Sequence, residues 1–193
     1  MPQKILELVL ITAGLATLLV VAGARIYGEH ERQHAVAAFS AARSAPDQSD
    51  WSPGRIAAFA AAEAGQPLAV LRMPGVALEV PVYGDTSERN LNRGAGTIAG
   101  TALPGSDGNA GIAAHRDGYF RKLKDVAVGD VVTLEHARGV RRYAVTELTI
   151  VEPTDVSPLA PTDEASLTLV TCYPFYFVGS APQRYIVRAV AIN

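Results

Sequence analysis

The chain has 193 residues, a net charge of −2 and a composition that is 49% hydrophobic. That length suits one modest domain with an appendage, and the balanced charge offers no basic surface for nucleic acid. The single cysteine excludes an internal disulfide, and the composition lacks the biases of disordered or fibrous chains.

An uncharged apolar segment, Leu8 to Ala24, dominates the N-terminus. It lies at the short end of the length needed for a membrane-spanning helix. A cleaved signal peptide is the alternative, with Ala22-Gly23-Ala24 as its cleavage site. The segment is long for a signal-peptide core, and Arg25 and Tyr27 follow it as interface anchors. We therefore predict a single-pass anchor, with the short N-terminus in the cytoplasm and the rest outside it.

The residues after this segment are expected to form a helical stem. Residues 28 to about 50 are polar and alanine-rich, which predicts a continuing helix that gives way to a linker. A second helix is predicted between Ser52 and Gly65. Serine can cap a helix N-terminus, Pro53 fits the first turn, and glycine fits the stop.

From Pro67 the chain changes to short β-rich runs broken by Gly, Pro, Asp and Asn. Short strands with irregular turns predict an all-β sandwich or barrel. The segment FRKLKDV predicts a helical turn between strands. The sequence thus divides into a cytoplasmic N-terminus and anchor (1–27), a helical stem and linker (28–66) and a β domain (67–193).

The one cysteine, Cys172, comes at the end of the apolar run Leu167 to Cys172. Strand alternation places Thr168, Val170 and Cys172 on one face. Tyr173-Pro174 then ends the strand, since proline cannot continue a central ladder. A lone cysteine can be a small buried hydrophobic residue. With a histidine available, it can also be a nucleophile.

Two further residues can join a cysteine in catalysis. His115 ends the apolar run GIAAH just before a turn, and His136 is a weaker candidate in a solvated position. Arg184 opens the last strand, with Arg188 on the same face. An arginine presents a rigid fork of donors that can stabilise an oxyanion. Alternatively, His115 is a polar strand end that meets water, and Arg184 is a surface arginine on an edge strand.

The string Thr168-Leu169-Val170-Thr171-Cys172 resembles the T-L-x-T-C signature of the sortase family. An upstream histidine, His115, and a downstream arginine, Arg184, follow the family's order. The segments HRDGYFRKLKDVAVGD and TCYPFYFVGSAPQRYIVRA look most like class D and Gram-negative (class GN) sortases. The resemblance covers roughly Pro67 to Asn193. It implies a mainly β fold, an eight-stranded sortase β-barrel, with an N-terminal transmembrane helix and a helical stem.

The resemblance also implies an activity. Cys172 would attack a C-terminal LPxTG-like sorting signal of an exported protein and form a thioacyl-enzyme. His115 would be the acid/base, and Arg184 the oxyanion partner. An amine acceptor would then take the acyl group. The resemblance places the enzyme in the cell (inner) membrane, with its catalytic domain on the extracytoplasmic side. No metal and no cofactor are expected, because no acidic cluster matches the calcium site of some relatives.

Four aromatic residues follow the cysteine closely: Tyr173, Phe175, Tyr176 and Phe177. Two interpretations of them stand side by side. These rings can line an apolar groove that binds the sorting signal. They can equally be ordinary core residues.

Two other functions compete with the transpeptidase. His30-Glu31-Arg32-Gln33-His34 matches the H-E-x-x-H motif of zinc proteases, which puts both imidazoles on one helix face. A zinc site needs a third ligand and a cleft, and a thin stem offers neither, so a chance match is preferred. The other alternative is a membrane-tethered β-barrel that binds sorting signals without cutting them.

Overall fold

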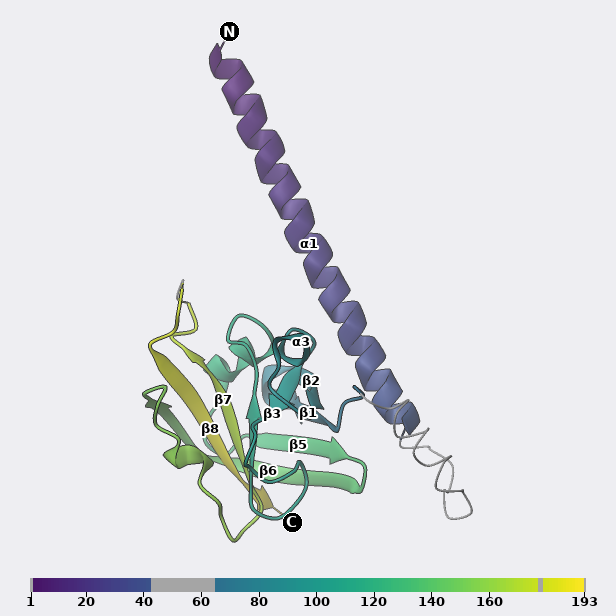
Figure 1. The fold of residues 1–193 in the computed structure, drawn as a ribbon, viewed down its shortest axis with the longest axis vertical. Helices are drawn as coiled ribbons and strands as arrows, with labels where there is room; N and C mark the ends of the chain where they lie inside the picture. The colour runs from purple at the N-terminus through teal and green to yellow at the C-terminus, as the bar shows by residue number, and fades with distance from the viewer. Residues whose placement is uncertain (1, 43–64, 177–178, 193) are drawn as a thin grey trace.

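A computed structural model of the chain describes residues 2–42, 65–176 and 179–192. The helix predicted after Ser52 lies outside the described residues. One long helix, α1 (Pro2–Ala42), leads to a β-barrel that begins at Ala69. Figure 1 shows the helix as a rod whose N-terminal half extends beyond the barrel.

Eight strands form the barrel. They are β1 (Ala69–Met73), β2 (Leu78–Tyr83), β3 (Ala95–Thr97), β4 (Asn109–Ala113), β5 (Val131–His136), β6 (Gly139–Val151), β7 (Ser166–Tyr173) and β8 (Gln183–Ile192). The sheet closes in the order β1-β2-β3-β4-β7-β8-β6-β5. Two neighbouring pairs, β2–β3 and β4–β7, are parallel, and the other pairs are antiparallel. The predicted eight-stranded barrel is confirmed.

Short helices punctuate the barrel: α3 (Glu88–Leu91), η1 (Pro74–Val76), η2 (Tyr119–Asp125) and η3 (Ser157–Leu159). The helical turn predicted over FRKLKDV is therefore confirmed as η2. The strands follow the two-residue period that the sequence indicates. In β5, for example, Val132 and Leu134 are fully buried, while Thr133 between them is more exposed. The inward-facing apolar side chains of all the strands fill the barrel as one core.

α1 has two distinct halves. Apolar side chains from Ile5 to Tyr27 are exposed, and the helix is long and apolar enough to cross a membrane. A membrane anchor and a signal sequence share that property. The helix then continues without a break through Gly28 into the polar stem, which confirms the predicted helical continuation.

The stem half of α1 packs against the outside of the barrel. Phe39 is only 4% exposed, and Ala35 is also buried. The helix contacts β1 and β2, whose outward-facing Val70 and Tyr83 are buried as well. Burial of such apolar surface stabilises the contact between helix and barrel. The stem half of α1 is thus packed on the barrel as well as leading to the apolar segment.

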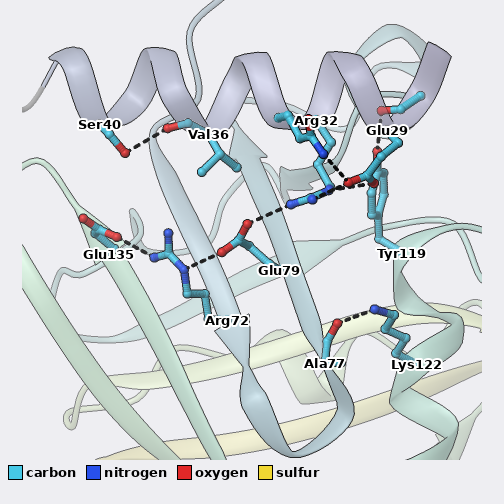
Figure 2. A network of polar contacts seen from close by, with 12 residues as sticks. Glu29, Arg32, Val36, Ser40, Arg72, Ala77, Glu79, Tyr119, Lys122 and Glu135 are labelled. Atoms are coloured by element: carbon cyan, nitrogen blue, oxygen red, sulfur yellow. Dashed lines mark hydrogen bonds and ion pairs between the residues drawn. The ribbon is translucent and has the colours of Figure 1, made fainter. Parts of the chain in front are cut away.

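A chain of alternating charges reinforces this contact (Figure 2). Arg32 of α1 bonds Glu29 of its own helix at 2.5 Å and Glu79 of β2 at 2.8 Å. Arg72 of β1 bonds Glu79 at 2.8 Å and Glu135 of β5 at 2.5 Å. Hydrogen bonds from Arg72, and then from Arg32, hold the pKa of Glu79 below its usual value.

The connection from β2 to β3 runs very close to β3. An ideal Cβ at Gly96 would lie 2.0 Å from the carbonyl oxygen of Asp85, so only glycine fits without a shift. The Thr97 hydroxyl donates to the carbonyl oxygen of Gly84 at 2.6 Å in the same crossing. This close approach brings α3, which follows directly, against β3.

Replacing Gly96 with alanine should therefore lower the free energy of unfolding by about 1–3 kcal/mol, because backbone must move to admit the methyl group. Gly75 in η1 is the matched control, since its nearest neighbour would be Asp130 Oδ1 at 4.0 Å. Gly75→Ala should change the stability by no more than about 0.5 kcal/mol. Thermal unfolding of both detergent-solubilised variants measures the difference. Equal melting temperatures would contradict the close crossing.

Candidate active site

The three candidate catalytic residues lie on two neighbouring strands, β7 and β8, and on the loop that follows the adjacent β4. β4 runs parallel to β7 with Ala113 opposite Val170, and Ala114 N–H donates to the Val170 carbonyl at 3.3 Å. His115 follows Ala113 by two residues and Cys172 follows Val170 by two residues, so both lie at the same end of this strand pair. On the other side of β7, Cys172 pairs directly with Arg184 of β8. Cys172 thus lies between the other two.

Cys172 lies on the outer face of the barrel. Leu167 and Leu169 point into the core, so Val170 and Cys172, in the alternate positions, point outward. Cys172 is a free, half-buried thiol. Residues paired in register present their side chains on the same face, so Arg184 and Cys172 share the outer face of the barrel.

The predicted strand ends differ by one or two residues from those observed. β7 continues past Cys172 to Tyr173, and β8 begins at Gln183, one residue before Arg184. β4 stops at Ala113, so His115 lies two residues beyond the strand that was expected to end on it. His115 therefore belongs to the loop that leads into η2.

Both threonines of the T-L-V-T-C string make buried hydrogen bonds. The Thr171 hydroxyl donates to the Ala114 carbonyl at 2.8 Å, which joins the residue before Cys172 to the residue before His115. The Thr168 hydroxyl donates to Asn109 Oδ1 at 2.8 Å. Thr171 thus fixes the separation of the two candidate catalytic residues, whereas Thr168 acts further down the strand.

Asn109 anchors the segment that covers this face. Its side-chain amide donates to the Pro158 and Ala160 carbonyls at 2.9 and 3.0 Å. Pro158 lies in η3 and Ala160 directly follows it, and an ideal Cβ at Gly111 would meet Leu159 at 2.9 Å. The cover buries Thr168 fully but leaves Val170 half-exposed. The outer face of β7 therefore opens towards Cys172.

Arg116, directly after His115, is a residue that the sequence reasoning missed. Its guanidinium donates to the Pro174 carbonyl at 3.1 Å and to the Gly179 carbonyl at 2.8 Å. It thereby ties the loop that carries His115 to both sides of the β7–β8 connection. Its position next to the histidine was the available signal, but sequence alone does not name its acceptors.

His115 and Arg184, the outer two of the three residues, each have polar contacts of their own. Glu88 of α3, 82% exposed, places Oε2 at 3.6 Å from His115 Nε2. An exposed pair of this kind contributes little energy, but it can favour one orientation of the ring. Arg184 donates to the Gln183 carbonyl at 3.0 Å and to the Ala181 carbonyl at 3.4 Å, both through Nη1.

The aromatic residues after the cysteine separate into two groups. Phe175 is 8% exposed in the core, and its ring and that of Tyr173 pack against Tyr185. The structure thus places Phe175 in the core, with Tyr173 partly buried against it. Tyr176 is 74% exposed. Phe177 lies outside the described residues.

The H-E-x-x-H motif lies in the stem half of α1. The rings of His30 and His34 meet edge-on with centroids 4.2 Å apart, so they share a helix face. Within residues 2–42, 65–176 and 179–192, no group of three or more His, Cys, Asp or Glu side chains is placed to hold a metal ion. The two histidines therefore have no third protein ligand in the part of the chain that the structure describes.

A thiol, an imidazole and a guanidinium at one end of the barrel can carry out acyl transfer. The thiolate is the nucleophile, imidazole can carry a proton, and guanidinium can donate to an oxyanion. The model of the sortase domain matches residues 71–192, which is most of the barrel. The chain belongs to the sortase family. Sortases are cysteine transpeptidases, so the chain is a sortase by family.

Individual relatives agree with this family. The chain is 33% identical over 126 residues to sortase D of Bacillus subtilis (strain 168), covering 65% of this chain and 64% of that protein. Among solved structures, sortase C1 of GBS pilus island 1 has a TM-score of 0.62 and 30% identity, over 66% of both chains. A Clostridium perfringens sortase D5 transpeptidase has a TM-score of 0.67 over 85% of this chain and 99% of its own. At 23% identity, that last likeness concerns the fold alone.

The matched part of the chain spans about half to two thirds of the length of the curated relatives. It covers 64% of the first relative and 47% of the second. The match therefore does not extend over the whole of those proteins.

The two threonines provide a test of how the candidate catalytic residues are held. Thr171→Val removes the hydroxyl and leaves the buried Ala114 carbonyl unpaired, so we expect about 1–3 kcal/mol of destabilisation. Without this bond the segments that carry His115 and Cys172 can shift relative to each other, so kcat should also fall about 10–100-fold. Thr168→Val is the control, with a similar stability cost and little change in kcat. Peptide cleavage kinetics and thermal unfolding measure both. Equal loss of kcat in the two variants would refute the positioning role of Thr171.

Proposed function

We propose that this protein is a membrane-anchored transpeptidase that cleaves a C-terminal LPxTG-like sorting signal of an exported protein. The observation that carries the proposal is the pairing of Cys172 on β7 with Arg184 on β8, together with His115 on the loop after the neighbouring β4. Their order along the chain is also that of the sortase family. The sequence features of the catalytic segments suggest class D or the Gram-negative sortases as the subgroup.

In the proposed reaction, the Cys172 thiolate attacks the carbonyl carbon of the scissile peptide bond. Arg184 donates hydrogen bonds to the oxyanion of the tetrahedral intermediate. His115 gives a proton to the leaving amine as the peptide bond breaks, which leaves a thioacyl-enzyme. The amine acceptor then attacks the thioester, loses a proton to His115 and takes the acyl group. Attack by water in place of the amine gives slow hydrolysis.

The arrangement of α1 and the barrel supports the membrane part of the proposal. We assign residues 1–27 to the cytoplasmic N-terminus and anchor, 28–66 to the stem and linker, and 67–193 to the catalytic domain outside the cytoplasm. β7 ends and β8 begins at the side of the barrel towards which the N-terminal half of α1 extends (Figure 1). A substrate held in the same membrane would present its sorting signal at that side.

A barrel that binds sorting signals without cutting them is the second candidate. It would need neither a thiol nor a histidine at this end of the barrel, so the presence of Cys172 and His115 there supports the transpeptidase. The zinc protease is disfavoured, because the stem motif supplies only His30 and His34 as ligands within the described part of the chain.

Cys172→Ala should abolish cleavage of a sorting-signal peptide and leave the barrel folded, because the nucleophile is lost from an outward-facing position. A sorting-signal mimic that carries a thiol-reactive group should label the wild-type protein at Cys172, as mass spectrometry can show. Circular dichroism checks the fold of the variant. Cleavage at near wild-type rate by Cys172→Ala would reject the assignment, and absence of selective labelling would favour the non-catalytic binder.

Arg184→Lys tests the oxyanion role. Lysine keeps the charge but loses the planar fork, so kcat should fall about 10²–10³-fold with little change in KM. Arg188 is the control, since it is on the same strand face but pairs with Thr168, well away from Cys172. Arg188→Lys should leave kcat nearly unchanged. A raised KM with normal kcat in Arg184→Lys would instead show that Arg184 binds the substrate in the ground state.

A further inference from the structure

One contact sets the height of η2 along the proposed anchor. The Tyr119 hydroxyl, at the start of η2, donates to the Gly28 carbonyl of α1 at 3.4 Å. Gly28 is four residues beyond Ala24, the last residue of the uncharged segment, which is about 6 Å along a helix. The headgroup layer on each side of a bilayer is about 5–8 Å thick. With Leu8 to Ala24 in the hydrocarbon, η2 therefore lies at the level of the lipid headgroups.

Positively charged side chains gather at the level of the lipid headgroups. A cavity of about 1070 Å³ between α1 and the barrel is lined by Arg25, Arg121, Lys122 and Lys124, together with the ion-paired groups of the helix contact. Of these four side chains, only Lys124 forms an ion pair with a carboxylate among the described residues, that of Asp125. Lys122 donates to the neutral Ala77 carbonyl (Figure 2). Arg25, Arg121 and Lys122 therefore present positive charge with no carboxylate bound to them in the part of the chain that the structure describes.

Most acidic side chains that line this cavity are bonded to basic side chains. Glu29 and Glu79 line the same cavity, but each is bonded to Arg32. Asp125 also lines the cavity and is paired with Lys124, which leaves the exposed Asp117 as the remaining acidic group in the lining. The cavity thus keeps an excess of positive charge towards the apolar half of α1, where Arg25 lies.

Arg121 connects this cluster to the catalytic end of the barrel. Its guanidinium carbon lies 5.2 Å from the ring centroid of Tyr176, the exposed aromatic residue on the β7–β8 connection. Its Nε is buried and has no hydrogen-bond partner among the described residues. Exposed tyrosine beside arginine is typical of residues that sit in the headgroup layer of a membrane.

We propose that Arg25, Arg121, Lys122 and Tyr176 form a docking surface for the phosphate headgroups of anionic phospholipids in the membrane that α1 crosses. The inference rests on the proposed anchor and adds a second point of attachment. Basic groups near an anionic membrane surface are attracted to it. With α1 as one support and this surface as the other, the barrel has a fixed tilt, and Cys172 is held facing the surface from which the substrate emerges.

The chain offers a clean chemical probe of this surface. Its only lysines are Lys4, Lys122 and Lys124, and the last two belong to η2. The full chain is placed in nanodiscs of phosphatidylcholine alone or with about 30% phosphatidylglycerol, an anionic lipid. Acylation of each lysine by a water-soluble amine reagent is followed by mass spectrometry. We expect the anionic lipid to slow acylation of Lys122 and Lys124 at least about threefold, and about 0.5 M salt to reverse most of the effect.

Matched variants locate the effect. Arg121→Gln with Lys122→Gln should remove most of the lipid-dependent protection of Lys124, which then serves as the reporter. Arg138→Gln with Arg141→Gln removes the same charge from the β5–β6 hairpin region, where these residues line a different cavity. That control should keep the protection of Lys124 at its wild-type value.

Three outcomes would overturn the inference. Equal acylation of Lys122 in both lipid compositions would show that η2 does not meet the headgroups. Protection by inorganic phosphate in phosphatidylcholine nanodiscs would show a site for free anions and not a lipid surface. Release of the full chain from vesicles by an alkaline wash would show that α1 is not an anchor, which rejects the membrane part of the proposed function as well. In the first two outcomes the anchor and the transpeptidase proposals still stand.

Discussion

The register of β7 between β4 and β8 is the constraint on which the site depends. β7 pairs in parallel with β4 and antiparallel with β8, and this places Cys172 opposite Arg184 and at the end of β4 that His115 follows. A slip of one residue would turn Cys172 into the core and bring Leu169 to the surface. The barrel prevents such a slip because Leu167 and Leu169 are buried in the common core. The core of the barrel therefore sets the geometry of the proposed chemistry.

Polar contacts also hold the segments that carry His115 and Cys172 next to each other. The Thr171 hydroxyl holds the Ala114 carbonyl, and Arg116 holds the carbonyls of Pro174 and Gly179. Both act between the segment that carries His115 and the segment that carries Cys172. Buried or partly buried hydrogen bonds of this kind add little net stability, but leaving their partners unpaired is costly. They therefore restrict the relative motion of the two segments more than they stabilise the fold.

The contact between α1 and β1–β2 links the barrel to the proposed membrane anchor. Phe39 supplies apolar burial, while Arg32 connects the helix to Glu79 and, through it, to Arg72. Since helix and barrel meet over the residues directly after the apolar segment, the height of the barrel above a membrane follows from the helix. The same geometry would orient the β7–β8 end of the barrel towards the substrate.

The sequence by itself determined the barrel class, the long N-terminal helix, η2 and the three candidate catalytic residues. Alternation of apolar residues reports which face of a strand is buried, and the T-L-V-T-C string is local. The tertiary structure alone decided that β4, β7 and β8 are neighbours, because such pairings join residues far apart in the chain. It also separated the buried Phe175 from the exposed Tyr176 and placed the stem on the barrel. Local pattern shows that a side chain is apolar, whereas only the packed fold decides what covers it.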